Sequence, residues 1–313
     1  MTRTRWQRLS SLITLALALV AIGIVVHVLN QFTWAQIEAS LARIRPWQFA
    51  GAVLCTAASY ATLTGFDWLG VAYAGGRVPY RRVALACFLS LSIGHTVGFA
   101  PLSSGAIRYR YYTEAGLDLR QIGLVVLLSA VTVTLGEVSL GGLAMVIQPV
   151  LTAKLLHLPP AMTGSIGAAC LVLPVAYGIL AVTLRRPFTI HKWSFRLPTP
   201  GIAVAQIGLG LLNYILVAGA LYFVLSAVAP IDFQSVAAAF VLGNLAALIT
   251  HVPGGLGVLE AVIATLLPGI DLIGPLIAFR IIYYLIPLAI GCLVLAATEL
   301  KLRVRPTKAK LTP

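Results

Sequence analysis

Charged side chains are scarce in this chain of 313 residues: Asp, Glu, Lys and Arg make up 10% of it, and only nine residues are acidic. Apolar residues make up 59%, and the mean hydropathy is +0.96. Such a composition has too little polar surface to cover the core of a water-soluble globule. It excludes a soluble enzyme and predicts a protein embedded in a lipid bilayer.

The sequence also lacks the patterns that bind metals or form disulfides. Its cysteines lie singly in apolar stretches, without CxxC spacing: Cys55, Cys87, Cys170 and Cys292. His95 and His251 are not accompanied by an HExxH motif or by another ligand spacing. We therefore expect no metal and no cofactor, and hydrogen-bonding roles for the two histidines.

Apolar runs of about 20 residues, long enough to cross a bilayer as helices, recur along the chain. Six of them are expected to be full spans: residues 9–29, 48–69, 121–147, 163–184, 201–226 and 275–298. Two further runs, residues 83–107 and 235–268, carry a proline and several glycines in their middle, which interrupts a helix. The run at 9–29 follows three arginines, and its length favours a retained anchor over a signal peptide.

Basic residues determine which side of the membrane each loop occupies. The net charge of +13 arises mainly from short loops and the two ends of the chain, a pattern typical of membrane topology rather than of nucleic-acid binding. Placing these loops in the cytoplasm puts both flanks of 83–107 on that side and both flanks of 235–268 outside. Each broken run is then a re-entrant hairpin or an even number of crossings. Both termini are expected in the cytoplasm, with the protein in a bacterial-type inner membrane.

The order of elements predicts an inverted repeat within a single membrane domain, residues 1–313. Each half, about 1–152 and 153–313, reads span, span, broken hairpin, span, and three crossings per half turn the second half upside down. At a constant offset Pro101 corresponds to Pro253, Gly105 to Gly257, and Arg108 to Glu260. The fold class is thus an all-α polytopic membrane protein with six full spans and two re-entrant hairpins. Because irregular backbone at membrane depth occurs only against protein or water, the two breaks indicate a shared site.

The first break could bind a phosphate. A helix that restarts near Ser103, Ser104 and Gly105 offers free N–H groups and a positive dipole end, with Arg108 further along it. The alternative is that Arg108 and Arg110 are interfacial arginines whose side chains extend to the lipid headgroups.

The second break combines glycines with a charge. Gly254, Gly255 and Gly257 allow a tight turn or close approach of a ligand, because they carry no Cβ. Glu260 requires an ionic partner in the bilayer, for binding or for structure alone.

Three more charges lie within or beside spans. Glu137, near the centre of an apolar run, is expected to be a counter-ion or a proton acceptor, or else a hydrogen-bonded packing residue. Arg280 pairs with a phosphate or carboxylate, or extends to the interface. Asp67 is expected at the cytoplasmic interface. An intramembrane hydrolase that pairs Ser103 or Ser104 with His251 has only the residue types in its favour.

Three segments, residues 98–111, 251–260 and 280–287, resemble the N-terminal flippase domain of the lysylphosphatidylglycerol synthetase family and its stand-alone relatives. The most specific part is Pro253-Gly-Gly-x-Gly-x-x-Glu260, followed by Gly105-x-x-Arg-Tyr-Arg110. The resemblance implies a domain that moves phospholipids, aminoacylated ones among them, between leaflets. The chain ends soon after its last span, so we expect the transport half without the transferase.

Three functions stay open from the sequence. A lipid flippase is expected first, with a phospholipid as substrate and no enzymatic activity. A non-transporting membrane partner in an envelope-lipid or isoprenoid-lipid pathway is the second, and an intramembrane enzyme the third. A second copy of the chain and a lipid-synthesis enzyme are the protein partners to consider.

Overall fold

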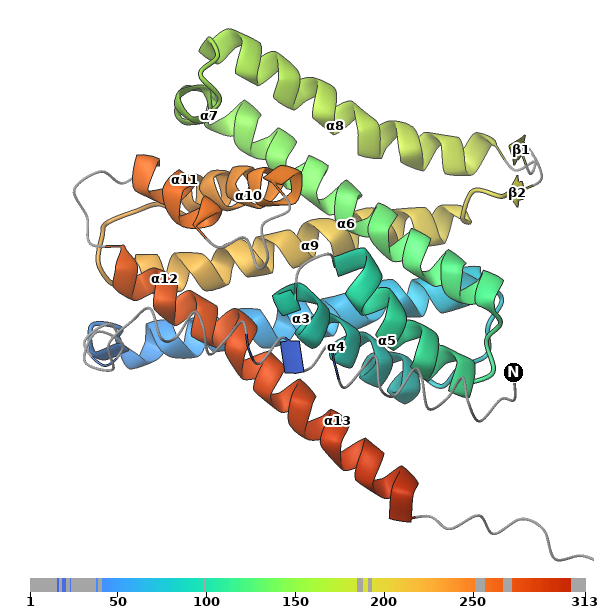
Figure 1. Cartoon of the computed structure of the whole chain (residues 1–313). Coiled ribbons are helices and arrows are strands. Elements are labelled where there is room, and N and C mark those ends of the chain that lie inside the picture. Colours follow the sequence, from blue (N-terminus) through green and yellow to red (C-terminus); the bar gives the residue numbers. More distant parts are fainter. Residues whose placement is uncertain are drawn as a thin grey trace, which may run out of the picture.

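The computed structural model describes residues 41–97, 100–184, 188–190, 193–250, 257–266 and 272–304, with a few single positions before residue 41. Its described elements are α3 (Pro46–Tyr73), α4 (Tyr80–Val97), α5 (Ala100–Glu114), α6 (Leu119–Ile147), α7 (Pro149–Leu156), α8 (Pro160–Thr183), β1 (Phe188–Ile190), β2 (Trp193–Phe195), α9 (Pro200–Leu225), α10 (Phe233–Thr250), α11 (Val258–Leu266), α12 (Ile273–Arg280), the π-helix η2 (Ile281–Leu285) and α13 (Ile286–Val304). The all-α membrane architecture is confirmed, and the short β1–β2 hairpin links α8 to α9 (Figure 1).

Six described helices are long and apolar enough to cross a membrane. Five of them, α3, α6, α8, α9 and the continuous helix Gly274–Thr298, match predicted spans. The predicted span at 9–29 lies outside the described residues. α10 is the sixth by length and composition, although its sequence was assigned to the second broken run. The re-entrant path of both hairpins and the inverted repeat stay predictions.

Helix starts follow from local chemistry. Proline stands at the first position of α3, α7, α8 and α9, where its fixed φ favours a helix and its missing N–H costs nothing. α6 begins with a capping box: Asp118 Oδ1 accepts the Gln121 N–H at 2.7 Å, and Gln121 Oε1 accepts the Asp118 N–H at 3.0 Å.

α3 and α9 pack along each other at the centre of the bundle. The contact is close because Gly51 lies beneath the ring of Phe223. In its middle Ser59 Oγ donates to Asn213 Oδ1 at 2.7 Å, so both polar groups are satisfied away from water.

Each broken run folds back on itself as two helices. α4 packs on α5 and α10 packs on α11, as Figure 1 shows. The first pair is the tighter, since a Cβ built on Gly94 would lie 3.1 Å from the backbone nitrogen of Ser104. A Cβ on Gly243 would meet the end of the flexible Leu259 side chain instead. Pro101 lies in the first turn of α5, so the first break precedes Ala100 and is not located at the proline as the sequence indicated.

The hairpins are also packed across the molecule. α6 contacts α10, where Gly141 approaches Val241, and α13 contacts α4, where Gly291 approaches Ser92. α8 lies on the outside, with many exposed apolar side chains, as expected for a lipid-facing helix. Gln206 of α9 anchors it by accepting from the Tyr177 hydroxyl at 2.7 Å.

Candidate functional site

The first hairpin is tied to the bundle by a buried ion pair between Arg108 on α5 and Asp67 on α3. Arg108 Nε donates to Asp67 Oδ2 at 2.8 Å, and Nη2 donates to Oδ1 at 2.9 Å. The geometry is bidentate, which is the strongest form of this interaction. Asp67 is 0% exposed and Arg108 is 5% exposed. The expectation that Asp67 lies at the interface was therefore wrong, because its carboxylate is the internal partner of Arg108.

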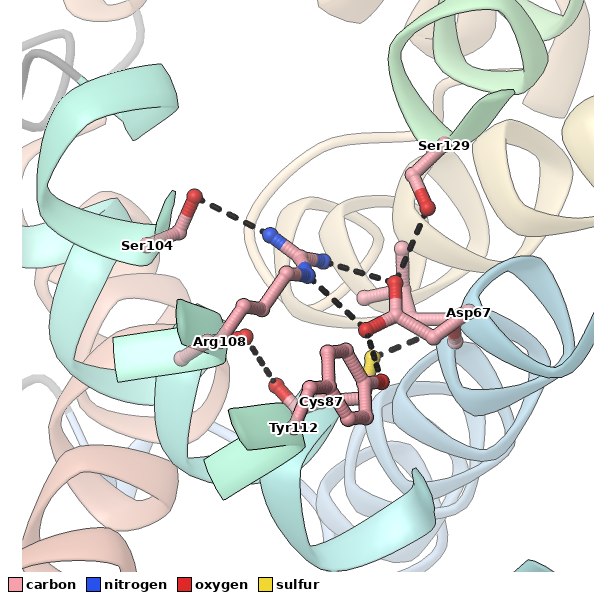
Figure 2. Close-up of polar contacts among 8 residues, drawn as sticks. Asp67, Cys87, Ser104, Arg108, Tyr112 and Ser129 are labelled. Atoms are coloured by element: carbon pink, nitrogen blue, oxygen red, sulfur yellow. Dashed lines mark hydrogen bonds and ion pairs between the residues drawn. The ribbon is translucent and has the colours of Figure 1, made fainter. Parts of the chain in front are cut away.

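The pair is saturated by neutral groups around it (Figure 2). The hydroxyls of Tyr112 and Ser129 donate to Asp67 at 2.6 and 2.9 Å, and Arg108 Nη1 donates to Ser104 Oγ at 3.0 Å. Ser129 belongs to α6, so three helices meet at one carboxylate. A buried pair is stable when its remaining lone pairs and protons are bonded in this way. Arg108 is therefore held by Asp67 and Ser104 inside the bundle.

The second hairpin carries an ion pair of a different kind. Arg280 Nε donates to Glu260 Oε1 at 2.7 Å, and Nη2 lies 2.5 Å from the same oxygen. The Glu260 side chain is 31% exposed and that of Arg280 is 15% exposed. The other oxygen of Glu260, Oε2, is buried without a hydrogen-bond donor among the residues that the structure describes. Glu260 therefore has unused capacity to accept a hydrogen bond.

A π turn follows Arg280 directly. Pro287 has no N–H, so the carbonyl of Tyr283 receives no helical hydrogen bond from that position, and the widened turn accommodates the ring. The hydroxyl of Tyr60 donates to the Tyr283 carbonyl at 3.4 Å instead. π turns inside α-helices often occur at functional sites, and this one begins at the residue after Arg280.

Glu137 lies at a third position, between α6, α9 and α10. Asn244 Nδ2 of α10 donates to Glu137 Oε1 at 2.9 Å and lies 3.4 Å from the hydroxyl of Tyr214 of α9. Glu137 is 8% exposed. The contact joins the last span of the first half to the second hairpin.

The structure thus identifies the ionic partners of two charges that the sequence placed at one site. Arg108 pairs with Asp67 rather than with Glu260, whose partner is Arg280. Whether Arg108, Glu137, Glu260 and Arg280 line one cavity stays a prediction. Among the described residues, no three His, Cys, Asp or Glu side chains are grouped to hold a metal.

The small residues of the two breaks are only partly described. Ser103 lies in α5, but its side chain is outside the described part of the structure. Gly254, Gly255 and His251 lie outside the described residues altogether. A Cβ at Gly105 would meet nothing within 4 Å, so space for an approaching group exists there. Gly257 has φ +79°, which requires glycine at the start of α11.

Sequence reasoning missed several neutral groups of these clusters: Tyr112, Ser129, Asn213, Tyr214 and Asn244. The available signal was an amide or hydroxyl inside an apolar span, because a polar group there needs a partner. Nothing in the sequence identified which partner.

Helical spans, two broken hairpins and ion pairs between helices define a polytopic α-helical membrane protein with charged sites inside the bundle. The chain belongs to the family described as the lysylphosphatidylglycerol synthase TM region, which matches residues 11–291. It is 31% identical to the uncharacterized protein slr0712 of Synechocystis sp. across 98% of both chains. It is also 27% identical to the inner membrane protein YbhN of Escherichia coli across 95% of both chains.

Proposed function

We propose that this protein is a lipid translocator of the inner membrane, which moves a phospholipid between leaflets without a chemical conversion. The family membership supports a role connected to lipids. The name of the Escherichia coli relative, inner membrane protein YbhN, supports the inner membrane as the location.

The Glu260–Arg280 pair is the observation that carries the proposal. It lies directly after the second break, it is partly exposed, and one carboxylate oxygen has no donor in the described part of the chain. A purely structural pair is expected to be satisfied on all sides, as Asp67 and Arg108 are.

A zwitterionic or aminoacylated headgroup can replace this pair without leaving a charge alone. Its phosphate would bind Arg280, whose guanidinium presents parallel N–H groups, and its amine would bind Glu260. Each charge exchanges one partner for another, which avoids the large cost of an unpaired ion in a low dielectric. The acyl chains would stay in the bilayer beside the hairpin.

The proposal includes the inverted repeat and two re-entrant hairpins. Its support is that each half packs its last span on the hairpin of the other half. α6 of the first half contacts α10, and α4 of the first half is contacted by α13 of the second. Cysteines in place of the exposed Arg77 and Arg120 should label from the cytoplasm, and one in place of Gln234 from outside. Labelling of all three from one side would contradict the repeat.

An intramembrane hydrolase has less support. Ser104 is buried and accepts a hydrogen bond from Arg108. That guanidinium is also held by Asp67, so Ser104 belongs to the buried network around the ion pair. We therefore propose that the protein is not an enzyme.

Reconstitution tests the proposal. The full chain is placed in liposomes with labelled phosphatidylethanolamine or phosphatidylglycerol, and movement between leaflets is measured. Arg280→Lys and Glu260→Gln should each slow transfer by about tenfold or more, because a charge-assisted hydrogen bond contributes about 1.5–3 kcal/mol. Lys154→Gln removes an exposed charge outside the site and should leave the rate unchanged. Transfer no faster than in protein-free liposomes would favour a non-transporting membrane partner.

A further inference from the structure

Glu137 differs from the other two acidic residues inside the bundle. Asp67 and Glu260 each contact an arginine, whereas the hydrogen bonds to Glu137 come from the neutral side chains of Asn244 and Tyr214. Glu137 is almost completely buried. Its charge, if present, would have no opposite charge beside it among the described residues.

Among the residues that the structure describes, the hydrogen bonds to Glu137 come from Asn244 and Tyr214 and not from a cation. Asp67 of α3 is engaged by Arg108 of α5, and Lys154 of α7 is exposed. α9 contributes Tyr214, and α10 has no charged residue. The ionisable groups of α8 and of the π turn are Cys170, Tyr177, Tyr283 and Tyr284. All four are neutral when protonated.

A buried carboxylate with only neutral partners is costly in a bilayer, whereas a protonated carboxyl can still hydrogen-bond an amide and a phenol. We propose that Glu137 is a proton-binding site, and that binding of the proton to its carboxyl favours the packing of α10 against α6. The carboxyl is neutral while α10 lies against α6. It loses its proton to water when the second hairpin moves away.

Asn244 is placed to make this coupling work. The side chains of α10 just before it, Val236 to Gly243, are buried, and those after it, such as Leu248 and Ile249, are exposed. Asn244 therefore lies where α10 leaves the protein core. Movement of the exposed end of α10 would expose Glu137 before it disturbs the buried end.

The proton balance is simple. Opening converts the Glu137 carboxylic acid into a carboxylate and transfers one proton to water, and closing takes one proton back. Because opening releases a proton, raising the pH favours the open hairpin, by up to about tenfold per pH unit. The link from this movement to lipid transfer rests on the proposed function, but protonation of Glu137 does not.

Infrared difference spectroscopy on the purified full chain tests the protonation directly. The wild-type spectrum minus that of Glu137→Gln should contain the carbonyl band of a protonated carboxylic acid. Glu114→Gln, which removes a partly exposed acid at the end of α5, should leave that band in place. A carboxylate band at neutral pH in the wild-type difference would overturn the proposal. Tyr214→Phe should keep the chain folded and shift the band, since one hydrogen-bond partner is lost.

Hydrogen exchange tests the coupling. After correction for intrinsic rates, exchange in α10 should rise with pH in the wild type and stay flat in Glu137→Gln. Equal pH dependence in both proteins would overturn the coupling. These readouts need no lipid transfer, so a protein that moves no lipid but shows both effects would refute the translocator and leave the proton site standing.

Discussion

Arg108 and Glu260, which the proposed inverted repeat places at corresponding positions, have different surroundings in the structure. Arg108 of the first hairpin is buried and saturated by Asp67 and Ser104. Glu260 of the second is partly exposed, and one of its oxygens has no donor in the described structure. The comparison distinguishes a buried ion pair that attaches one hairpin from a partly exposed pair that we propose to be exchangeable in the other.

Asp67→Ala should have the largest effect, because it leaves Arg108 buried without a counter-charge. A loss of about 3–5 kcal/mol of stability is expected, enough to prevent recovery of folded protein. Thermal unfolding in detergent and the monodisperse fraction are the measurements.

A matched double variant sharpens this prediction. Asp67→Leu together with Arg108→Met removes both charges and should be far more stable than Asp67→Ala alone. If Asp67→Ala unfolds at the wild-type temperature, the first pair is not the attachment that we describe.

Alanine scanning of glycines compares the close contacts. Gly105→Ala should stabilise α5 by roughly 0.5–1 kcal/mol, because nothing opposes the new methyl group. Gly94→Ala should give no such increase in stability, because the added methyl group would lie too close to the Ser104 backbone. Unfolding temperatures should rank Gly105→Ala above Gly94→Ala, and the reverse order would contradict the tight packing of α4 on α5.

Glu260→Gln should cost less stability than Asp67→Ala, because the Glu260–Arg280 pair is partly exposed whereas the Asp67–Arg108 pair is buried. Its effect on lipid transfer should be large by comparison. A melting temperature lowered as far as in Asp67→Ala would show that both hairpins are fixed attachments.

The smallest effect is expected at Asp232, which lies outside the spans and caps α10. Burial alone would raise the pKa of its carboxyl, but hydrogen bonds from the Ser235 hydroxyl and N–H lower it below its ordinary value of 3.8. The cap is therefore fully present above pH 3.8 and is lost as the pH falls through the lower folded pKa. Asp232→Asn keeps a capping side chain and should remove this acid dependence from the unfolding temperature. An unchanged acid dependence would exclude Asp232 as its source.

The sequence predicted the membrane class and the matching spans because apolar run length alone determines them. It also located both broken runs, although α5 begins at Ala100 and Pro101 lies within its first turn rather than at the break. The charge pairing could not be predicted: Arg108 lies in a hairpin and Asp67 at the end of another helix, and their contact depends on helix rotation. The same limit applies to Glu137 and Asn244.

The contact of α13 with α4 constrains how the protein is made. Leu89 and Ile93 of the first hairpin share a buried cluster with Leu288 and Leu295 of α13. The ribosome synthesises α4 long before α13, so lipid or the insertion machinery must cover this apolar surface in the interval. A nascent chain stalled before α13 would hold an incompletely packed first hairpin. Completion of the first half is therefore one of the last events of biogenesis.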